Sequence, residues 1–152
     1  MEESLEDAAE EIKRAEHLFY VSLKYTRTVD VIRSLIGRLI STFDCALLSL
    51  LKYAKEKKKI KDIPPTPIAR CDLLEKTFKD INITKYIDLY LLLRKLLRAP
   101  YTKREEYRRH VTMISELEDR KLEVNIDTLK EDYDKTMDFL KLVKDTIRSK
   151  KW

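Results

Sequence analysis

Glycine is nearly absent from this chain: of its 152 residues one alone, Gly37, is a glycine. A phosphate-binding P-loop needs two glycines and a dinucleotide fingerprint needs three, because their backbones must approach the phosphates closely. The turn that carries the nucleophile of an α/β-hydrolase also needs two, and an EF-hand loop needs a turn glycine among its acidic ligands. The sequence therefore excludes these nucleotide-binding, hydrolytic and calcium-binding classes.

Cysteine and histidine are also scarce, with two of each. No Cys-x-x-Cys, His-Glu-x-x-His or Glu-x-x-His motif occurs, so neither a metal nor a cofactor is expected. The acidic start lacks the basic and apolar segments of a signal peptide, and charges interrupt the apolar runs before the roughly 18 to 20 residues of a membrane span. We therefore expect a cytoplasmic protein that does not cross a membrane.

Apolar residues recur at three- and four-residue steps through most of the chain, which predicts helices. Five helices are expected, over about 5–25, 29–58, 67–80, 84–99 and 127–147. Thr28 and Thr66 are suited to cap the second and third of them. The β-favouring runs around 110–114 and 122–124 predict a short hairpin at about 108–125. The expected fold is a mainly α, up-down bundle around a long central helix, as one domain over 1–152.

Basic residues gather in two places, after the long helix and around the end of the helix over 84–99. In the second place arginines are interleaved with Tyr101 and Tyr107. Arginines pair with phosphates and tyrosines stack on bases, which favours nucleic-acid binding. The candidate nucleic-acid-binding residues are Arg94, Arg98, Tyr101, Arg104, Arg108 and Arg109. A solvated face of ion pairs is the alternative interpretation, because 39% of the chain is charged.

Arg104 and His110 form a candidate catalytic pair. An arginine stabilises the charge on a scissile phosphate while a histidine moves a proton, which is the chemistry of a metal-independent ribonuclease. The alternative is chance spacing in a chain with 32 Lys and Arg residues. Both interpretations remain open at the level of sequence.

Several segments resemble a known family. Residues 15–21, Ala-Glu-His-Leu-Phe-Tyr-Val, the proline-rich linker 63–67 and the excursion 100–124 are similar to a set of archaeal all-α proteins. Their layout resembles HEPN-type domains (higher eukaryote and prokaryote nucleotide-binding). The resemblance implies a helical bundle, often dimeric, that is either a toxin ribonuclease with an Arg-x4-6-His motif or an inactive binding module. Arg104 and His110 match that spacing, whereas Glu105 follows the arginine where the motif usually has a polar residue such as Asn.

Two residues of the long predicted helix carry expectations about packing. Gly37 lies in mid-helix, where it costs up to about 1 kcal/mol relative to Ala, so we expect another helix or a second copy of the chain to cross close to it. Asp44 is expected to be half-buried and hydrogen-bonded to an Arg or Tyr. The extent of this apolar helix also predicts a homodimer.

The sequence thus favours a binding or interaction protein without enzymatic activity. RNA is the first candidate partner, through the arginine cluster. A HEPN-like ribonuclease that uses Arg104 and His110, and a structural partner of another protein, are the alternatives.

Overall fold

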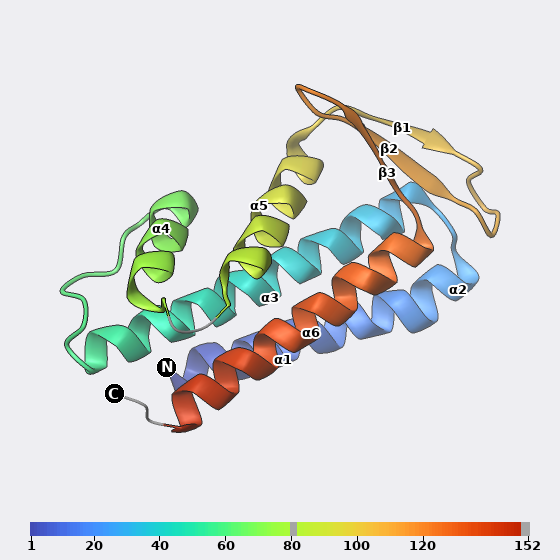
Figure 1. The fold of residues 1–152 in the computed structure, drawn as a ribbon. Coiled ribbons are helices and arrows are strands. Elements are labelled where there is room, and N and C mark those ends of the chain that lie inside the picture. The colour runs from blue at the N-terminus through green and yellow to red at the C-terminus, as the bar shows by residue number, and fades with distance from the viewer. Residues whose placement is uncertain (80–81, 150–152) are drawn as a thin grey trace.

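The computed structural model describes residues 1–79 and 82–149, and it is mainly helical with a small antiparallel sheet, so the predicted mainly α class is confirmed (Figure 1). In chain order the elements are α1 (Glu2–His17), the π-helical segment η1 (Leu18–Ser22), α2 (Leu23–Tyr25), α3 (Val29–Glu56), α4 (Pro67–Thr77), α5 (Thr84–Arg98), β1 (Tyr101–Arg104), β2 (Thr112–Glu116), β3 (Lys121–Val124) and α6 (Ile126–Ser149). The expected end of the third helix near residue 80 is not reached: α4 ends at Thr77, and residue 80 itself lies outside the described residues.

Side-chain caps fix where the helices begin. The hydroxyls of Thr28 and Thr66 each accept a hydrogen bond of 3.3 Å from a backbone N–H three residues further on, as the sequence predicts. At the start of α6, Asn125 and Thr128 each accept a bond of 2.9 Å from the other's backbone N–H. These bonds satisfy N–H groups that have no partner within a helix, and so hold the first turns in place.

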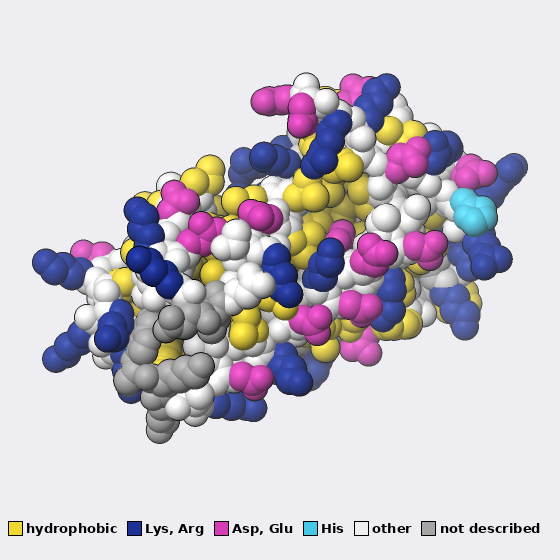
Figure 2. All heavy atoms as spheres, in the orientation of Figure 1, with side chains coloured by type: hydrophobic (Ala, Val, Ile, Leu, Met, Phe, Trp, Pro, Cys, Tyr) yellow, Lys and Arg dark blue, Asp and Glu magenta, His cyan; other side chains and the backbone are white. Residues whose placement is uncertain are grey.

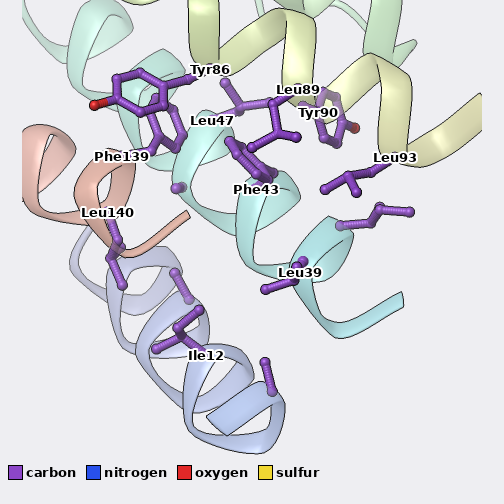
Figure 3. Packing of buried hydrophobic residues seen from close by; sticks show 14 of the residues in the cluster. Ile12, Leu39, Phe43, Leu47, Tyr86, Leu89, Tyr90, Leu93, Phe139 and Leu140 are labelled. Atoms are coloured by element: carbon purple, nitrogen blue, oxygen red, sulfur yellow. The ribbon is translucent and has the colours of Figure 1, made fainter. Parts of the chain in front are cut away.

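The hydrophobic core is centred on α3, which is in contact with α1, α4, α5 and α6. Figure 1 shows α1 and α6 along one side of α3, with α4 and α5 on the other. The fully buried ring of Phe43 lies between aromatic rings of two neighbouring helices, with centroids 5.1 Å from Phe139 and 5.6 Å from Tyr90 (Figure 3). The Tyr90 hydroxyl donates a hydrogen bond to Asp44, which confirms the predicted partner of that carboxylate.

α3 is also long and apolar enough, by length and composition, to cross a membrane, with a mean hydropathy of 1.5 over its most apolar window. The two charges that interrupt the window do not lower its hydropathy below that of a span. Within the fold, 61% of the window is buried. The core helix of a soluble protein gives the same pattern, so the helix is weak evidence for a membrane span.

The first predicted helix differs from the structure at its end. Residues 2–25 are helical throughout, but η1 interrupts the α-helical repeat at Leu18–Ser22. A π-helical turn holds more residues than an α-helical turn, so it shifts the side chains beyond it around the axis. Tyr20 and Val21 are exposed there, at 49% and 40%. No glycine or proline marks the segment in the sequence, which is why periodicity misses it.

The predicted hairpin is wider than expected. It is a three-stranded sheet of order β1-β2-β3, and the additional strand, β1, begins at Tyr101 rather than near residue 108. β1 pairs with β2 from Tyr101 opposite Ser115 to Arg104 opposite Thr112. Three of its four residues are exposed, so the sequence Tyr-Thr-Lys-Arg needs no alternation of apolar and polar residues. Without that alternation the strand has no signal in the sequence.

The apolar repeat predicts buried positions at Ile68 and Met137, which is wrong, and the packing at Gly37 is looser than expected. Met137 and Ile68 are exposed at 42% and 66%, whereas Phe139 takes the buried place on α6. α5 does approach Gly37, but a Cβ added there would lie 4.0 Å from Leu97 Cδ1, an ordinary van der Waals contact. Gly37 therefore leaves room for a methyl group, and nothing at this position requires a close backbone approach.

Candidate nucleic-acid interface

The loop between β1 and β2, residues 105–111, is fixed to the connection between α2 and α3. The Glu106 carboxylate accepts a hydrogen bond of 3.1 Å from the backbone N–H of Val29, the first residue of α3. The backbone N–H of Tyr107 donates to the carbonyl of Arg27 at 2.6 Å. A negative charge at a helix N-terminus is favourable because of the helix dipole, so the loop and α3 stabilise each other.

A cavity of about 380 Å³ lies where this loop meets the start of α6. Three arginines and a histidine, Arg27, Arg104, Arg109 and His110, line it, and we call it the cationic cavity. Figure 2 shows a histidine and several Lys or Arg side chains at the right-hand end of the molecule, where Figure 1 places the β1–β2 loop. The structure thus brings Arg27 together with two arginines of a distant segment, Arg104 and Arg109.

The arginines of the cationic cavity differ in their partners. Arg104 Nη1 lies 2.7 Å from Glu123 Oε1 on β3, and this hydrogen bond raises the pKa of Arg104. Within the described residues no ion pair includes Arg27 or Arg109. Arg27 Nε is buried and has no hydrogen-bond partner among the described residues. A buried donor without a partner costs about 1–3 kcal/mol.

Acidic side chains share the lining with the arginines. Glu105 and Asp127 both line the cationic cavity, and Glu123 is already bound to Arg104. The cavity is therefore no cage of cations around one small ion. Arg108, beside it on the loop, is exposed and has no ion pair within the described residues. A polyanion long enough to reach Arg108 as well gains more than a single phosphate does.

The predicted catalytic pair meets at this cavity. Arg104 ends β1, while His110 lies at the end of the loop, and both line the same cavity. His110 is exposed, and its backbone carbonyl accepts a hydrogen bond of 2.8 Å from the Thr112 hydroxyl. Because both residues line one cavity and His110 is exposed, one ligand can reach the imidazole and the guanidinium group together.

The other predicted nucleic-acid-binding residues lie elsewhere. Arg98 lines a different cavity, of about 630 Å³, next to the turn between β2 and β3. Because that turn and the loop 105–111 are at opposite ends of β2, the length of the strand separates Arg98 from Arg109. Arg94 lies further back on α5, with its Cζ 5.6 Å from the centre of the Tyr90 ring.

The two tyrosines of the cluster have different environments. The ring of Tyr101 is half-buried and already occupied by a cation, because the guanidinium carbon of Arg33 lies 4.2 Å from its centre. Arg33 also donates to the carbonyl of Leu97 at 2.9 Å, which makes this a structural contact between α3, α5 and β1. Tyr107 is 77% exposed. Tyr101 is thus held by the fold, and Tyr107 is the tyrosine that a ligand can reach.

Sequence reasoning misses Arg27, which is the one arginine of the cationic cavity that lies far from the other two along the chain. It stands between Thr26 and Thr28 in the connection between two helices, with no run of basic residues around it. The only hint is the Thr28 cap, which places the preceding residue at a helix start. Contact with the distant loop 105–111 is what gives Arg27 its role.

No group of three or more His, Cys, Asp or Glu side chains in the described residues is placed to hold a metal ion. Comparison with known proteins identifies no relative: no protein-family model matches the chain, and no curated protein or solved structure matches it at a significant level. The fold and the site by themselves define a mainly α protein with a cationic cavity between a small sheet and the start of two helices.

Proposed function

We propose that the chain binds RNA through phosphate groups at the cationic cavity. The observation that carries this proposal is the convergence of Arg27, Arg104, Arg109 and His110 on one cavity. Guanidinium groups bind phosphate oxygens with two parallel hydrogen bonds, which makes arginine suited to this role. RNA supplies successive phosphates, so it engages the cavity and the exposed Arg108 together.

Two double substitutions distinguish RNA binding at the cationic cavity from a general attraction of RNA to any basic surface. We expect Arg104→Ala with Arg109→Ala to weaken binding of a fluorescently labelled RNA by at least about 10-fold at low salt, measured by anisotropy. The matched control is Arg94→Ala with Arg98→Ala, which removes the same charge outside the cationic cavity. We expect the control to stay within about 2-fold of the wild type, because these residues make no contact at the cavity. Equal losses in the two double variants would contradict the proposal.

A metal-independent ribonuclease is the second candidate function, favoured by the meeting of Arg104 and His110 at one cavity. In such a reaction His110 accepts the proton of the ribose 2′-hydroxyl, the 2′-oxygen attacks phosphorus, and the bond to the 5′-oxygen breaks while that oxygen takes a proton from water. The products are a 2′,3′-cyclic phosphate and a 5′-hydroxyl end. Arg104 stabilises the charge that develops on the phosphate oxygens.

The ribonuclease is tested with purified protein and RNA in the presence of EDTA. We expect cleavage by the wild type and none by His110→Ala, while RNA binding by the variant stays measurable. Equal cleavage by the two proteins would point to a contaminating nuclease and would remove this candidate.

Two further expectations stay predictions of the sequence: the up-down order of the bundle and the homodimer. The exposed Tyr20, Val21 and Met137 supply apolar surface that a second copy could cover. Sedimentation equilibrium at micromolar concentration measures the oligomeric state, and a monomer alone would remove the homodimer.

A further inference from the structure

Backbone strain is concentrated in the loop 105–111. Three described residues other than glycine have positive φ, and two of them, Glu105 at 53° and Tyr107 at 66°, lie in this loop. For a bulky residue this left-handed conformation is an outlier, because its Cβ crowds the following carbonyl oxygen. Glycine adopts it without that cost, so a tyrosine at this position is less stable than a glycine would be.

The ring of Tyr107 does nothing within the fold that would explain its presence. Its side chain is 77% exposed. Within the described residues it takes part in no hydrogen bond, ring contact or cation–π contact, whereas Tyr101, Tyr90 and Tyr133 each do. Only its backbone N–H is used, in the bond to Arg27. A mostly exposed ring on a strained backbone, without a hydrogen bond or ring contact in the described residues, points to a role in contact with something outside the chain.

The position of Tyr107 relates it to the cationic cavity. Its backbone is bonded to Arg27, and Glu105 and Arg109, two residues before and after it, line the same cavity. The bond to Arg27, together with the Glu106 bond to the start of α3, fixes the loop at its centre. The backbone that carries this exposed ring is therefore fixed in place between residues that line the cationic cavity.

We infer that Tyr107 stacks on an unpaired base while the cationic cavity holds the neighbouring phosphates, so that the partner is single-stranded RNA. This inference rests on the proposed function. Bases in a duplex are stacked on one another and offer their faces to no side chain, whereas an unpaired base has a free face. Stacking on an aromatic side chain contributes about 1–3 kcal/mol per base by alanine substitution, which corresponds to about 5-fold to 150-fold in affinity. A duplex would engage only the arginines.

The test compares two RNAs and four variants by anisotropy. The probes are a labelled single strand of about ten nucleotides, a length typical of such sites, and a hairpin duplex with the same number of phosphates. The variants are Tyr107→Ala, Tyr107→Phe, Tyr107→Gly and the control Tyr25→Ala. Tyr25 is a suitable control because it is as exposed as Tyr107, at 78%, and does not line the cationic cavity.

We expect Tyr107→Ala to weaken binding of the single strand by at least about 5-fold and to change duplex binding by less than about 2-fold. Tyr107→Phe keeps the affinity because the ring face remains, and Tyr25→Ala leaves both probes unaffected. Tyr107→Gly gives opposite changes: the melting temperature rises because the backbone strain is relieved, while single-strand affinity falls as in Tyr107→Ala.

Three results would overturn the inference in distinguishable ways. If wild type and Tyr107→Ala bind the single strand equally, with affinity that falls steeply with salt, the stacking role is lost and phosphate binding remains. If Tyr107→Gly lowers the melting temperature, the ring has a structural role instead. If the wild type binds neither RNA, the proposed function fails and the inference fails with it.

Discussion

The helical body and the loop 105–111 differ in how their arginines are paired and in how their aromatic rings are packed. On the face where α1 meets α3, Arg14 and Arg38 both bind Glu11, at 2.6 Å and 3.1 Å. In the loop, Arg108 and Arg109 have no ion pair within the described residues. The solvated ion-pair face that the sequence offers as an alternative interpretation thus describes the contact between α1 and α3. It does not describe Arg108 and Arg109, which no ion pair holds within the described residues.

Packing separates the same two regions. The rings of the body are buried against each other, with Phe43 and Phe139 stacked at 5.1 Å. The ring of Tyr107 is exposed on a strained backbone. We infer from this difference that the packed rings stabilise the helical body, whereas the loop carries an exposed ring at a cost in stability, for which ligand binding is the role that we propose.

The largest effect that tests this division is expected in the body. Phe43→Ala leaves a cavity among the rings of Tyr90 and Phe139 and should lower the free energy of unfolding by about 3–5 kcal/mol. Urea denaturation followed by circular dichroism measures it. Because the cationic cavity is formed by the loop 105–111 and not by these rings, the folded fraction of the variant should bind RNA as the wild type does. A loss below about 1 kcal/mol would show that the body is not the source of stability.

Asp132, on α6, is a partly buried carboxylate of the helical body that no ion pair holds within the described residues. Burial raises its pKa to about 6 from the usual 3.8, an effect that Glu131 adds to and Lys135 opposes. The folded protein therefore holds this proton more tightly than the unfolded chain, so stability falls as the pH rises from about 4 to about 6. Asp132→Asn should remove this dependence and raise the free energy of unfolding at pH 7 by about 2 kcal/mol.

Thermal or urea unfolding of both proteins at a series of pH values checks the prediction for Asp132. The two curves should meet below about pH 4, where the carboxyl is protonated in either state. A constant difference across the whole range would instead show that the Asn side chain alters packing, and would leave Asp132 without a role in the pH dependence.

The smallest effect is expected at Gly37. A Cβ there meets only Leu97 Cδ1, at 4.0 Å, so a methyl group fits without displacement. Gly37→Ala should therefore raise the free energy of unfolding by up to about 1 kcal/mol, because alanine favours the helix. Destabilisation by this variant would show instead that α3 packs more tightly at Gly37 than the structure indicates.

Local signals in the sequence predict the helices well. Thr28 and Thr66 cap the helices that they were expected to cap, and Tyr90 is the partner that Asp44 requires. These features depend on neighbours a few residues away or on the general cost of burying a charge. The segment η1 and strand β1 could not be found in this way, because both depend on tertiary packing that overrides local propensity.

The candidate site could be predicted only in part. Arg104 and His110 lie near each other in the sequence, and the loop brings both to the cationic cavity. Arg98 is as close to Arg104 along the chain as His110 is, yet the length of the sheet separates it from the cavity. Arg27 is absent from the predicted site because only the hydrogen bond from Tyr107 to its carbonyl brings it there. Sequence distance is a good guide within a tight loop and a poor guide along an extended strand.

The salt dependence of RNA binding by wild type and Arg109→Ala tests the central claim most directly. Each phosphate contact with a single strand contributes roughly −0.7 to the slope of log affinity against log salt. If Arg109 binds a phosphate at the cationic cavity, the variant should bind more weakly and with a slope flatter by roughly 0.7, whereas Arg98→Ala should leave the slope unchanged. Identical slopes for wild type and Arg109→Ala would contradict the account.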